Sequence, residues 1–548
     1  RYPPRTLQYF IAAAKEQGQR ANQVEAFDEH TRRQVEYYAA YDETCQREGA
    51  VDFAELLLRS YEVLARHQGL REHYQQRFRH ILIDEFQDTN VLQYKWLRML
   101  AGRATSVFAV GDDDQSIYAF RGADVGNMQN FQQDFAPIEL IKLEQNYRSH
   151  GNILDAANAL IKNNQARLGK NLWTQESKGE PLRVYSAPTD YDEAAFIVDA
   201  VKGLVGEGVN ATEIAVLYRS NAQSRVLEHA LFNAGMPYRV YGGMRFFERA
   251  EVKHALAYLR LIANPDDDGA LLRIINFPPR GIGARTLEGL VAQGKGSSAS
   301  LWQVACASAP SGKSGSSVAT FVRLVESMRS ATAGVPLPEA VEHVIATSGL
   351  LAHFEAERDG QERVDNLREL VAAADSFQRE AHSAAPSIDD SGDSGAPVDA
   401  LGAFLSHAAL EAGDTQAGEG SDALQLMTVH SAKGLEFHTV FVTGLEEGLF
   451  PHDNSFDELG GPEEERRLMY VALTRARRRL YLTYAQSRSL HGQFRYNVVS
   501  RFLDEIPQSL LHWLSTTPAN LRAAPPPPAW DPDAPPRARV EPVPSGPG

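Results

Sequence analysis

The chain has 548 residues, of which 43% are hydrophobic and 23% charged, and its formal net charge is −16. This length exceeds what one hydrophobic core supports, so we expect several domains of ordinary soluble composition. The negative charge excludes a protein that coats nucleic acid through bulk charge, but it is compatible with a local basic groove, because salt confines electric fields to about 10 Å. The two cysteines, Cys45 and Cys306, lie far apart, which excludes a disulfide framework and favours a reducing compartment. No apolar run is long enough to span a bilayer.

Helical and strand-like segments follow one another along the chain. Residues 1–75 carry apolar residues at helical spacing and are predicted to be helical. Two sets of strand-like segments alternate with helical ones and predict parallel sheets: Ile81–Ile83, Val107–Val110 and Ile138–Leu143, then Val184–Tyr185, Ile214–Tyr218, Leu424–Thr428, Val440–Val442 and Leu480–Thr483. The gap between Tyr218 and Leu424 is too long for a simple crossover, so we expect a mostly helical inserted domain at residues 243–421. The tail from Ala523 holds ten of the 28 prolines and is predicted to be disordered.

Two carboxylates follow the first strand, which its three apolar residues predict to be buried. Asp84 and Glu85 come where the strand ends, and open α/β sheets bind ligands at the carboxyl ends of their strands. One carboxylate there can hold Mg²⁺ and a second can orient a water molecule. The alternative is an acidic corner without a function.

The segment after the second strand combines a possible phosphate contact with aromatic residues. It reads Gly-Asp-Asp-Asp-Gln-Ser-Ile-Tyr-Ala-Phe-Arg-Gly at residues 111–122. Gln115 could bond a terminal phosphate or its attacking water, and Tyr118, Phe120 and Arg121 could form a stacking platform for bases. Two core aromatics beside a surface arginine are locally the better interpretation.

Three further segments carry charged residues near predicted strands. Arg148 follows Tyr147 at the end of the third strand, and an arginine fork suits a terminal phosphate. The small-residue loop at 428–437 holds His430, Lys433 and Glu436, which can touch phosphate and sugar. Residues 463–478 are predicted to form a helix with glutamates in its first turn and arginines in its last. That helix is either simply well capped and solvated, or it lets Arg475 reach a phosphate across a domain cleft.

The joint order of these segments is more informative than any one of them. Asp-Glu at a strand end, Gly-Asp-x-Asp-Gln, Asn-Tyr-Arg-Ser, His-x-x-Lys-Gly-Leu-Glu-Phe and Leu-Thr-Arg-Ala occur in this order. The set resembles the motifs of superfamily 1 DNA helicases of the UvrD/Rep/PcrA group, most of all the UvrD type. The resemblance runs from about Tyr2 to Phe502, and it includes residues 51–57, 217–225, 241–247 and 280–283.

This resemblance implies an α/β fold with two RecA-like parallel-sheet domains, helical inserted domains, and ATP with Mg²⁺ between the sheets. Residues 1–75 would be the remnant of an inserted helical domain and 76–150 part of an incomplete first RecA-like domain. Residues 151–242 and 422–515 would form the second RecA-like domain, 243–421 its helical insertion, and 516–548 a disordered tail.

The resemblance also implies roles for single residues. For ATP, Asp84 would bind Mg²⁺, Glu85 would activate water, Gln115 would sense the γ-phosphate, Tyr147 would stack on adenine, Arg148 and Arg475 would be arginine fingers, and Glu436 would approach the ribose. For single-stranded DNA, the implied contacts are Tyr118, Phe120, Arg121, Arg219, Asn221 and His430, and for duplex phosphate the turn with Arg280, Gly281 and Gly283. Two departures stand out: Phe120 replaces a frequent Trp, and Pro279 removes a backbone donor beside that turn.

The family's phosphate-binding loop, G-x-x-x-x-G-K-[ST], has no match here. The nearest stretch, Ser311–Ser314, has Ala307 at the position of the first glycine and is interpreted as linker. We therefore expect an N-terminally truncated chain that shows no DNA-stimulated ATPase by itself and tends to aggregate.

The function implied for the complete protein is that of an ATP-dependent 3′–5′ DNA helicase of nucleotide excision and mismatch repair. It would act as a monomer or dimer in the cytoplasm, near the nucleoid, on single-stranded DNA and junctions, with repair proteins as partners and without a membrane. The alternatives are a non-catalytic DNA-binding remnant and, less favoured because no room is left for a nuclease domain, a helicase–nuclease.

Overall fold

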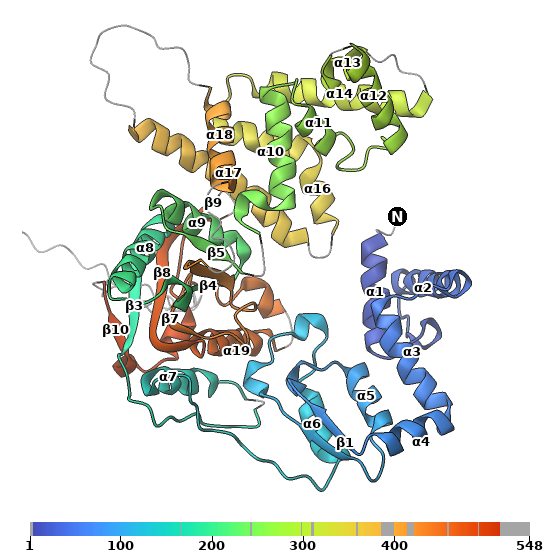
Figure 1. Cartoon of the computed structure of the whole chain (residues 1–548), viewed down its shortest axis with the longest axis vertical. Coiled ribbons are helices and arrows are strands. Elements are labelled where there is room, and N and C mark those ends of the chain that lie inside the picture. The colour runs from blue at the N-terminus through green and yellow to red at the C-terminus, as the bar shows by residue number, and fades with distance from the viewer. Residues whose placement is uncertain are drawn as a thin grey trace, which may run out of the picture.

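The computed structural model describes residues 4–165, 167–241, 244–297, 299–307, 312–357, 360–384, 399–413, 421–457, 460–490 and 493–515. Figure 1 shows the N-terminal helices beside a small sheet, a larger sheet to the left of both, and a helical group above the larger sheet. The predicted α/β class with parallel sheets is confirmed. In this part of the chain no helix is long and apolar enough to cross a membrane. The proline-rich tail, residues 516–548, lies outside the described residues.

The N-terminal part is helical, as predicted. Its helices pack around a small core that includes Tyr38, and a buried Lys15 supports them by ion pairs to Asp52 at 2.8 Å and Glu55 at 3.0 Å. Because burying an unpaired charge is costly, these ion pairs favour one arrangement of the helices. The helices are α1 (Pro4–Glu16), α2 (Glu29–Glu48), α3 (Phe53–Arg66) and α4 (Gln68–Arg77).

The first sheet departs from the sequence prediction in two ways. β1 (His80–Ile83) pairs in parallel with β2 (Ser106–Ala109), while α5 (Val91–Leu100) and α6 (Gly126–Asp134) complete this unit. The expectation of a buried β1 is wrong, because Leu82 is 75% exposed on a face that no described helix covers. The strand expected at Ile138–Leu143 is also wrong: this segment has no ladder partner among the described residues, and Leu143 is exposed.

The second sheet has the order β10-β3-β8-β7-β4-β6-β5, all parallel, with β9 pairing antiparallel to β8. Strand burial follows a period of two, since Ala215 and Leu217 of β4 face one apolar core while Ile214, Val216 and Tyr218 face the other. One core includes helices α7 (Gly151–Ile161) and α19 (Gly461–Leu473), and the other includes α8 (Asp190–Gly206) and α9 (Ser224–Asn233). The strands are β3 (Leu182–Thr189), β4 (Ile214–Tyr218), β5 (Tyr238–Val240), β6 (Leu424–Thr428), β7 (Phe437–Val442), β8 (Ala476–Leu490), β9 (Gln493–Tyr496) and β10 (Leu511–Trp513), and a short α20 (Arg501–Asp504) precedes β10.

A helical insertion separates β5 from β6, as the sequence predicts, and has its own apolar core. The linker interpretation of Ser311–Ser314 is wrong from Gly312 onward, because a helix begins there, whereas Ser311 lies outside the described residues. The helices are α10 (Ala250–Ala263), α11 (Asp268–Ile274), α12 (Ala284–Ser297), α13 (Leu301–Ala307), α14 (Gly312–Thr332), α15 (Leu337–Thr347), α16 (Leu350–Glu355), α17 (Gly360–Ala384) and α18 (Ala400–Gly413).

Candidate nucleotide and DNA site

The first sheet places two carboxylates at its carboxyl edge. Asp84 and Glu85 directly follow β1, both are exposed, and the Glu85 amide donates to Asp84 Oδ1 at 2.9 Å. Glu85 has a φ of 47°, a left-handed conformation that no other described non-glycine residue adopts. Strain of this kind gathers at functional sites. Carboxylate oxygens are the ligands that Mg²⁺ prefers, so the exposed Asp84 fits a magnesium ion.

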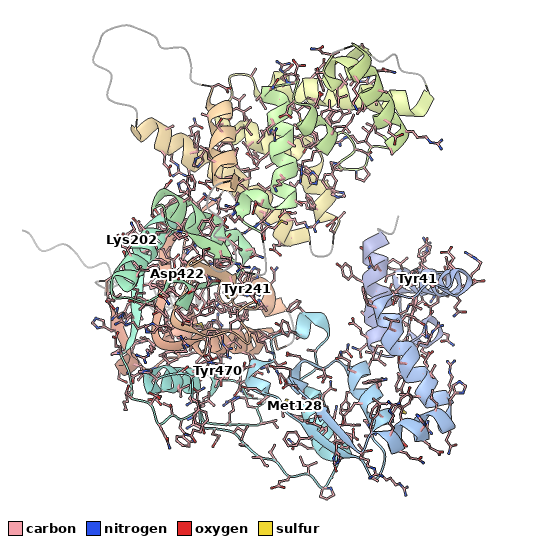
Figure 2. The ribbon with its side chains drawn as sticks, in the orientation of Figure 1. Tyr41, Met128, Lys202, Tyr241, Asp422 and Tyr470 are labelled. Carbon is pink, nitrogen blue, oxygen red and sulfur yellow. The ribbon has the colours of Figure 1, made fainter. Side chains whose placement is uncertain are left out.

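A second acidic group near this edge does not fit a metal ion. The side chains of Asp112, Asp113 and Asp114 lie close together. However, Lys170 pairs with Asp112, and Arg167 pairs with Asp114 at 2.6 Å. These cations come from the segment after α7, and buried Tyr470 of α19 lies close by, under the Lys170 ammonium (Figure 2). The aspartates therefore join the two sheet domains.

The second sheet places a glutamate and an arginine at its amino edge. Glu436 directly precedes β7 and Arg475 directly precedes β8, and the first pair of these parallel strands, Phe437 and Ala476, lies next to them. The helix predicted at 463–478 is shorter than expected: α19 ends at Leu473 and carries no base in its last turn. The position of the Arg475 side chain is therefore set by the turn after α19 and not by helical periodicity.

Arg475 is 1% exposed and its guanidinium bonds only uncharged groups. It donates to the carbonyls of Val471 and Leu435 at 3.0 and 3.1 Å, and to Gln115 Oε1 of the first domain at 3.4 Å. Among the described residues no carboxylate pairs with it. Burial, together with the neighbouring charge of Arg148, lowers the Arg475 pKa to about 10. A buried cation in this state attracts an anion.

Arg148 joins the same cluster from the segment that connects the two domains. Its Nε lies 2.5 Å from Glu436 Oε2, and its Nη1 donates to the Thr474 carbonyl at 3.5 Å. The hydrogen bond from Arg148 lowers the Glu436 pKa. Tyr147 beside it is 82% exposed. The structure thus gathers Gln115, Arg148, Glu436 and Arg475, which sequence reasoning selected separately, although their roles stay predictions.

Lys433 is a site residue that the sequence indicated as able to touch phosphate, but for which it predicted no specific role. Its buried ammonium crosses from the second domain to donate to Asp88 Oδ2 at 2.7 Å and to the Gln115 carbonyl at 2.9 Å, and it lies 3.8 Å from Glu85 Oε2. Burial raises the Asp88 pKa, and the ion pair with Lys433 offsets part of that rise. The available signal was a lysine in a loop of small residues between two strands.

Aromatic residues of both domains form a row at the opposite, carboxyl edge of the second sheet. His430 follows β6, and the Phe120 ring lies edge-on to it at 5.6 Å and tilted against Tyr118 at 6.0 Å. Tyr118 is half-buried beneath the Lys433 ammonium, 5.0 Å from its ring. Phe120 is 57% exposed, so the interpretation as two core aromatics fails for Phe120. The side chain of Arg121 lies outside the described residues.

Two other predicted DNA residues are engaged within the protein. Arg219, which follows β4, binds Glu465 through Nη2 at 2.8 Å. Asn221 donates to Glu362 Oε1 of α17 at 2.6 Å. Both lie at the carboxyl edge that carries His430, since β4 and β6 are paired neighbours. A DNA phosphate would have to compete with Glu465 for the arginine.

The Arg280–Gly283 turn lies in the helical insertion, apart from the residues gathered between the two sheet domains. The Arg280 guanidinium points inward, donating to the Tyr258 hydroxyl at 2.6 Å and to the Ser348 carbonyl at 2.8 Å. The amides of Arg280 and Ile282 both donate to Asn276 Oδ1. Gly281 has a φ of 75°, which glycine adopts without strain. Any phosphate contact of this turn therefore depends on the amides of Gly281 and Gly283.

Two parallel-sheet domains meet at loops that hold an exposed carboxylate pair and a buried arginine with no carboxylate partner among the described residues. These features define a class, the two-domain α/β proteins with phosphate-binding residue types gathered where the domains meet. The comparisons identify the family. Residues 1–136 match the UvrD/REP helicase N-terminal domain, and residues 141–487 match the UvrD-like helicase C-terminal domain. The chain belongs to the UvrD-like DNA helicase family.

Individual relatives agree with this assignment. The chain is 50% identical over 517 residues to DNA helicase II of Escherichia coli strain K12, a match that covers 92% of this chain and 70% of the relative. It is 40% identical over 551 residues to ATP-dependent DNA helicase UvrD1 of Mycobacterium tuberculosis strain H37Rv, covering 96% and 71% of the two chains. It is 38% identical over 490 residues to ATP-dependent DNA helicase PcrA of Bacillus subtilis strain 168, covering 87% and 64%.

Proposed function

We propose that this chain carries the motor of an ATP-dependent DNA helicase that moves 3′ to 5′ along single-stranded DNA in nucleotide excision and mismatch repair. Family membership supports the helicase activity, and the names of two relatives include ATP dependence. The direction and the repair pathways rest on the resemblance of the motifs. We place the protein in the cytoplasm near the nucleoid, on single strands and junctions, as a monomer or dimer with repair proteins as partners.

One observation carries the ATP part of the proposal: the buried Arg475 has no carboxylate partner among the described residues and lies beside Gln115 of the other domain. A planar guanidinium binds phosphate oxygens in a fork, and an arginine supplied across a domain boundary stabilises charge that develops in phosphoryl transfer. ATP bound in the cleft would supply the phosphoryl group. Arg475 and Arg148 would then face its terminal phosphate from the second domain.

The first domain would supply the remaining groups. Asp84 would hold Mg²⁺, Glu85 would accept a proton from the attacking water, and Gln115 would orient that water. Tyr147 would stack on the base, and Glu436 would bond the ribose. Lys433 lies 3.8 Å from Glu85 and can exchange this carboxylate for a phosphate when the cleft is occupied.

The short path between the two sites supports coupling of hydrolysis to DNA movement. Gln115 contacts Arg475 at the phosphate side, while Phe120, five residues later, contacts His430 at the DNA side. Opening a base-pair step costs about 1.4 kcal/mol, and stacking a base on an aromatic side chain returns roughly 1–3 kcal/mol. Binding can therefore capture an opened base, but release and repetition need ATP, which would move the segment 115–120.

Hydrolysis also needs a loop that fixes the phosphates, and residues 1–548 contain no G-x-x-x-x-G-K-[ST] sequence. We propose that these residues alone bind ATP poorly and show no DNA-stimulated ATPase. Calorimetric titration of residues 1–548 with Mg²⁺ and a non-hydrolysable ATP analogue tests this. Micromolar binding would contradict it and would identify a phosphate site of another kind.

The test of the arginine uses the full-length protein. Arg475→Ala is expected to lower the DNA-stimulated ATPase rate by about 10³–10⁵-fold, and Arg475→Lys to restore little, because an ammonium lacks the planar fork. Arg478→Ala, an exposed arginine at the start of the same strand, is the matched control and should stay near the wild-type rate. An Arg475→Ala rate within tenfold of wild type would refute the role of Arg475. A wild-type protein without DNA-stimulated ATPase would instead favour a DNA-binding chain without hydrolysis.

A further inference from the structure

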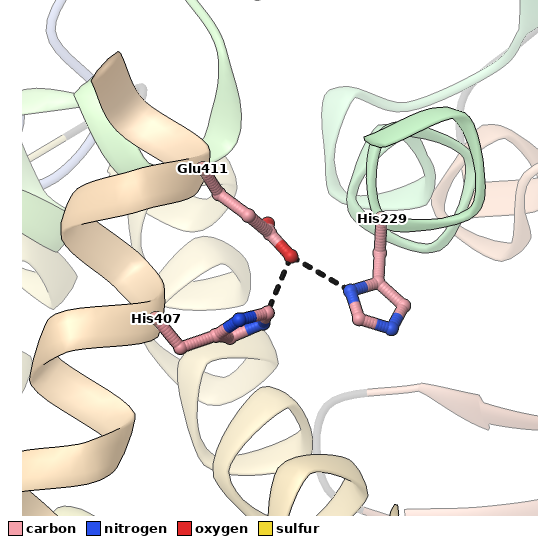
Figure 3. Close-up of side chains that lie close together, drawn as sticks. All are labelled: His229, His407 and Glu411. Atoms are coloured by element: carbon pink, nitrogen blue, oxygen red, sulfur yellow. Dashed lines mark hydrogen bonds and ion pairs between the residues drawn. The ribbon is translucent and has the colours of Figure 1, made fainter. Parts of the chain in front are cut away.

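A compact group of two histidines and one glutamate lies where the second sheet domain meets the helical insertion. His229 is on α9 of the sheet domain, and His407 and Glu411 are on α18 of the insertion (Figure 3). The Glu411 carboxylate contacts His229 Nδ1 at 2.7 Å and His407 Nε2 at 2.9 Å through the same oxygen. None of these residues belongs to the nucleotide or DNA sites.

The geometry suits a metal ion better than a simple ion pair. His407 and Glu411 lie four residues apart, which places them on one face of the helix. The two ring nitrogens and the carboxylate oxygen all lie within 4.8 Å of one another. Four-coordinate Zn²⁺ has bonds of about 2.0–2.2 Å and so keeps its ligands roughly 3.3 Å apart. The side chains would need to separate by only about half an ångström to admit the ion.

The surroundings orient His229 as they do in metal sites. Its other ring nitrogen, Nε2, lies 3.2 Å from Glu380 Oε1 of α17, to which it can donate, and 3.1 Å from Asn233 Nδ2, which can donate to it only when Nε2 is unprotonated. A metal-ligating histidine commonly donates its second ring N–H to a carboxylate, which fixes the tautomer and the ring. With Nε2 protonated toward Glu380, the lone pair of Nδ1 points at the position between His407 and Glu411.

The local charge permits a dication. The Glu411 carboxylate lies between the two imidazoles and supplies a negative charge for the ion. Two arginines lie nearby: Arg225 is paired with Glu369 at 2.6 Å, and Arg245, which is paired with Glu248 at 3.1 Å, donates to the Glu411 carbonyl at 3.3 Å. His407 and His229 keep some solvent exposure, which gives an ion a route in.

We propose that His229, His407 and Glu411 bind one divalent transition-metal ion, with Zn²⁺ as the best fit and water as the fourth ligand. Two imidazoles and one carboxylate in a tetrahedral arrangement favour Zn²⁺ over Mg²⁺, which prefers six oxygen ligands. On binding, the ion replaces the protons that the two ring nitrogens share with Glu411. The bound ion ties α9 to α18 and so holds the helical insertion against the sheet domain.

Metal titration of the chelator-treated protein tests the site. The titration is run in excess Mg²⁺, which occupies the oxygen ligands elsewhere but competes poorly for imidazole. Zn²⁺ binding is followed by calorimetry, and Co²⁺ by the intense visible bands of four-coordinate cobalt. We expect the wild type to bind one equivalent that His407→Gln lacks. Zn²⁺ should also slow amide exchange in α9 and α18 of the wild type alone.

Two further variants separate a metal site from general histidine binding. Glu380→Gln leaves all three ligands in place, so it should keep the stoichiometry and lose about 10–100-fold in affinity. His343→Gln is the matched control, since His343 is a half-buried histidine on α15 that contacts the Thr347 hydroxyl at 3.4 Å. It should bind metal as the wild type does. Equal stoichiometry and affinity in wild type and His407→Gln would overturn the proposal, as would a weak six-coordinate cobalt spectrum.

Discussion

Phe120 offers the sharpest test of how the chain holds single-stranded DNA. Its ring is 57% exposed, at the edge of the row formed with Tyr118 and His430. Tyr118 is less suitable for substitution, because its half-buried ring also packs against the core of the second sheet and lies beneath Lys433. Phe120→Ala therefore removes a stacking surface with little loss of buried area, and the folded state should change by no more than about 0.5 kcal/mol.

The expected loss follows from one stacked base. Stacking on an aromatic side chain contributes roughly 1–3 kcal/mol per base, and each 1.4 kcal/mol is a factor of ten, so the affinity should fall about 5- to 150-fold. No charge is removed, so the slope of log affinity against log salt should stay unchanged while the line shifts. Fluorescence anisotropy with a labelled oligonucleotide over a salt series measures both quantities.

A matched control variant comes from β9. Phe494 is 62% exposed and, like Phe120, lies beside a tyrosine two residues away, Tyr496 at 5.3 Å. Phe494→Ala should leave the affinity for DNA as it is. The stacking argument is wrong if Phe120→Ala binds DNA as tightly as Phe494→Ala, or if it changes the salt slope and not the intercept.

Three further outcomes follow from the site and the fold. Glu85→Gln should keep ATP binding in the intact protein and lower single-turnover hydrolysis by about 10²–10⁴, the usual contribution of a general base; a loss below tenfold would contradict the role. Burial alone would raise the pKa of Glu55, but Arg20 and Lys15 outweigh it and lower that pKa from 4.5 to about 2. The ionised Glu55 carboxylate therefore stabilises the fold above pH 4.5, and this stabilisation is lost as the pH falls toward 2. Amide exchange in α3 should be faster in Glu55→Gln than in wild type at pH 7, and this difference should vanish near pH 2. Arg488→Met should destabilise the second sheet domain by about 3–5 kcal/mol in urea unfolding, because two buried glutamates lose their shared cation; an unchanged midpoint would refute this.

Local sequence was sufficient to predict a structural feature where that feature depends only on one strand and the residues that follow it. The strands Ile214–Tyr218 and Leu424–Thr428 are found with the predicted bounds, because short segments that are mostly apolar and bounded by polar residues fit a sheet covered on both faces. The carboxylates after β1 and the arginine after β4 lie at strand ends for the same reason. The order of the motifs also sufficed to predict the helicase family, which the comparisons confirm.

Tertiary structure decided which of these residues meet and in what surroundings. The apolar run at Ile81–Ile83 does not reveal whether other elements cover both faces of its strand. The exposure of Leu82 could therefore not be predicted from the sequence. The segment Ile138–Leu143 has strand character but no ladder partner among the described residues, and a strand exists only where a neighbour accepts its hydrogen bonds.

The contacts of charged residues across domains could not be predicted from local sequence patterns either. The sequence by itself determined that Arg475, Lys433 and His229 are present, together with the strand or helix that carries each. It did not determine that Arg475 is buried beside Gln115, that Lys433 crosses to Asp88, or that His229 faces Glu411. These contacts join segments separated by more than 180 residues, and they form only because two sheets and a helical insertion pack together, which hydrophobic periodicity along one segment does not encode.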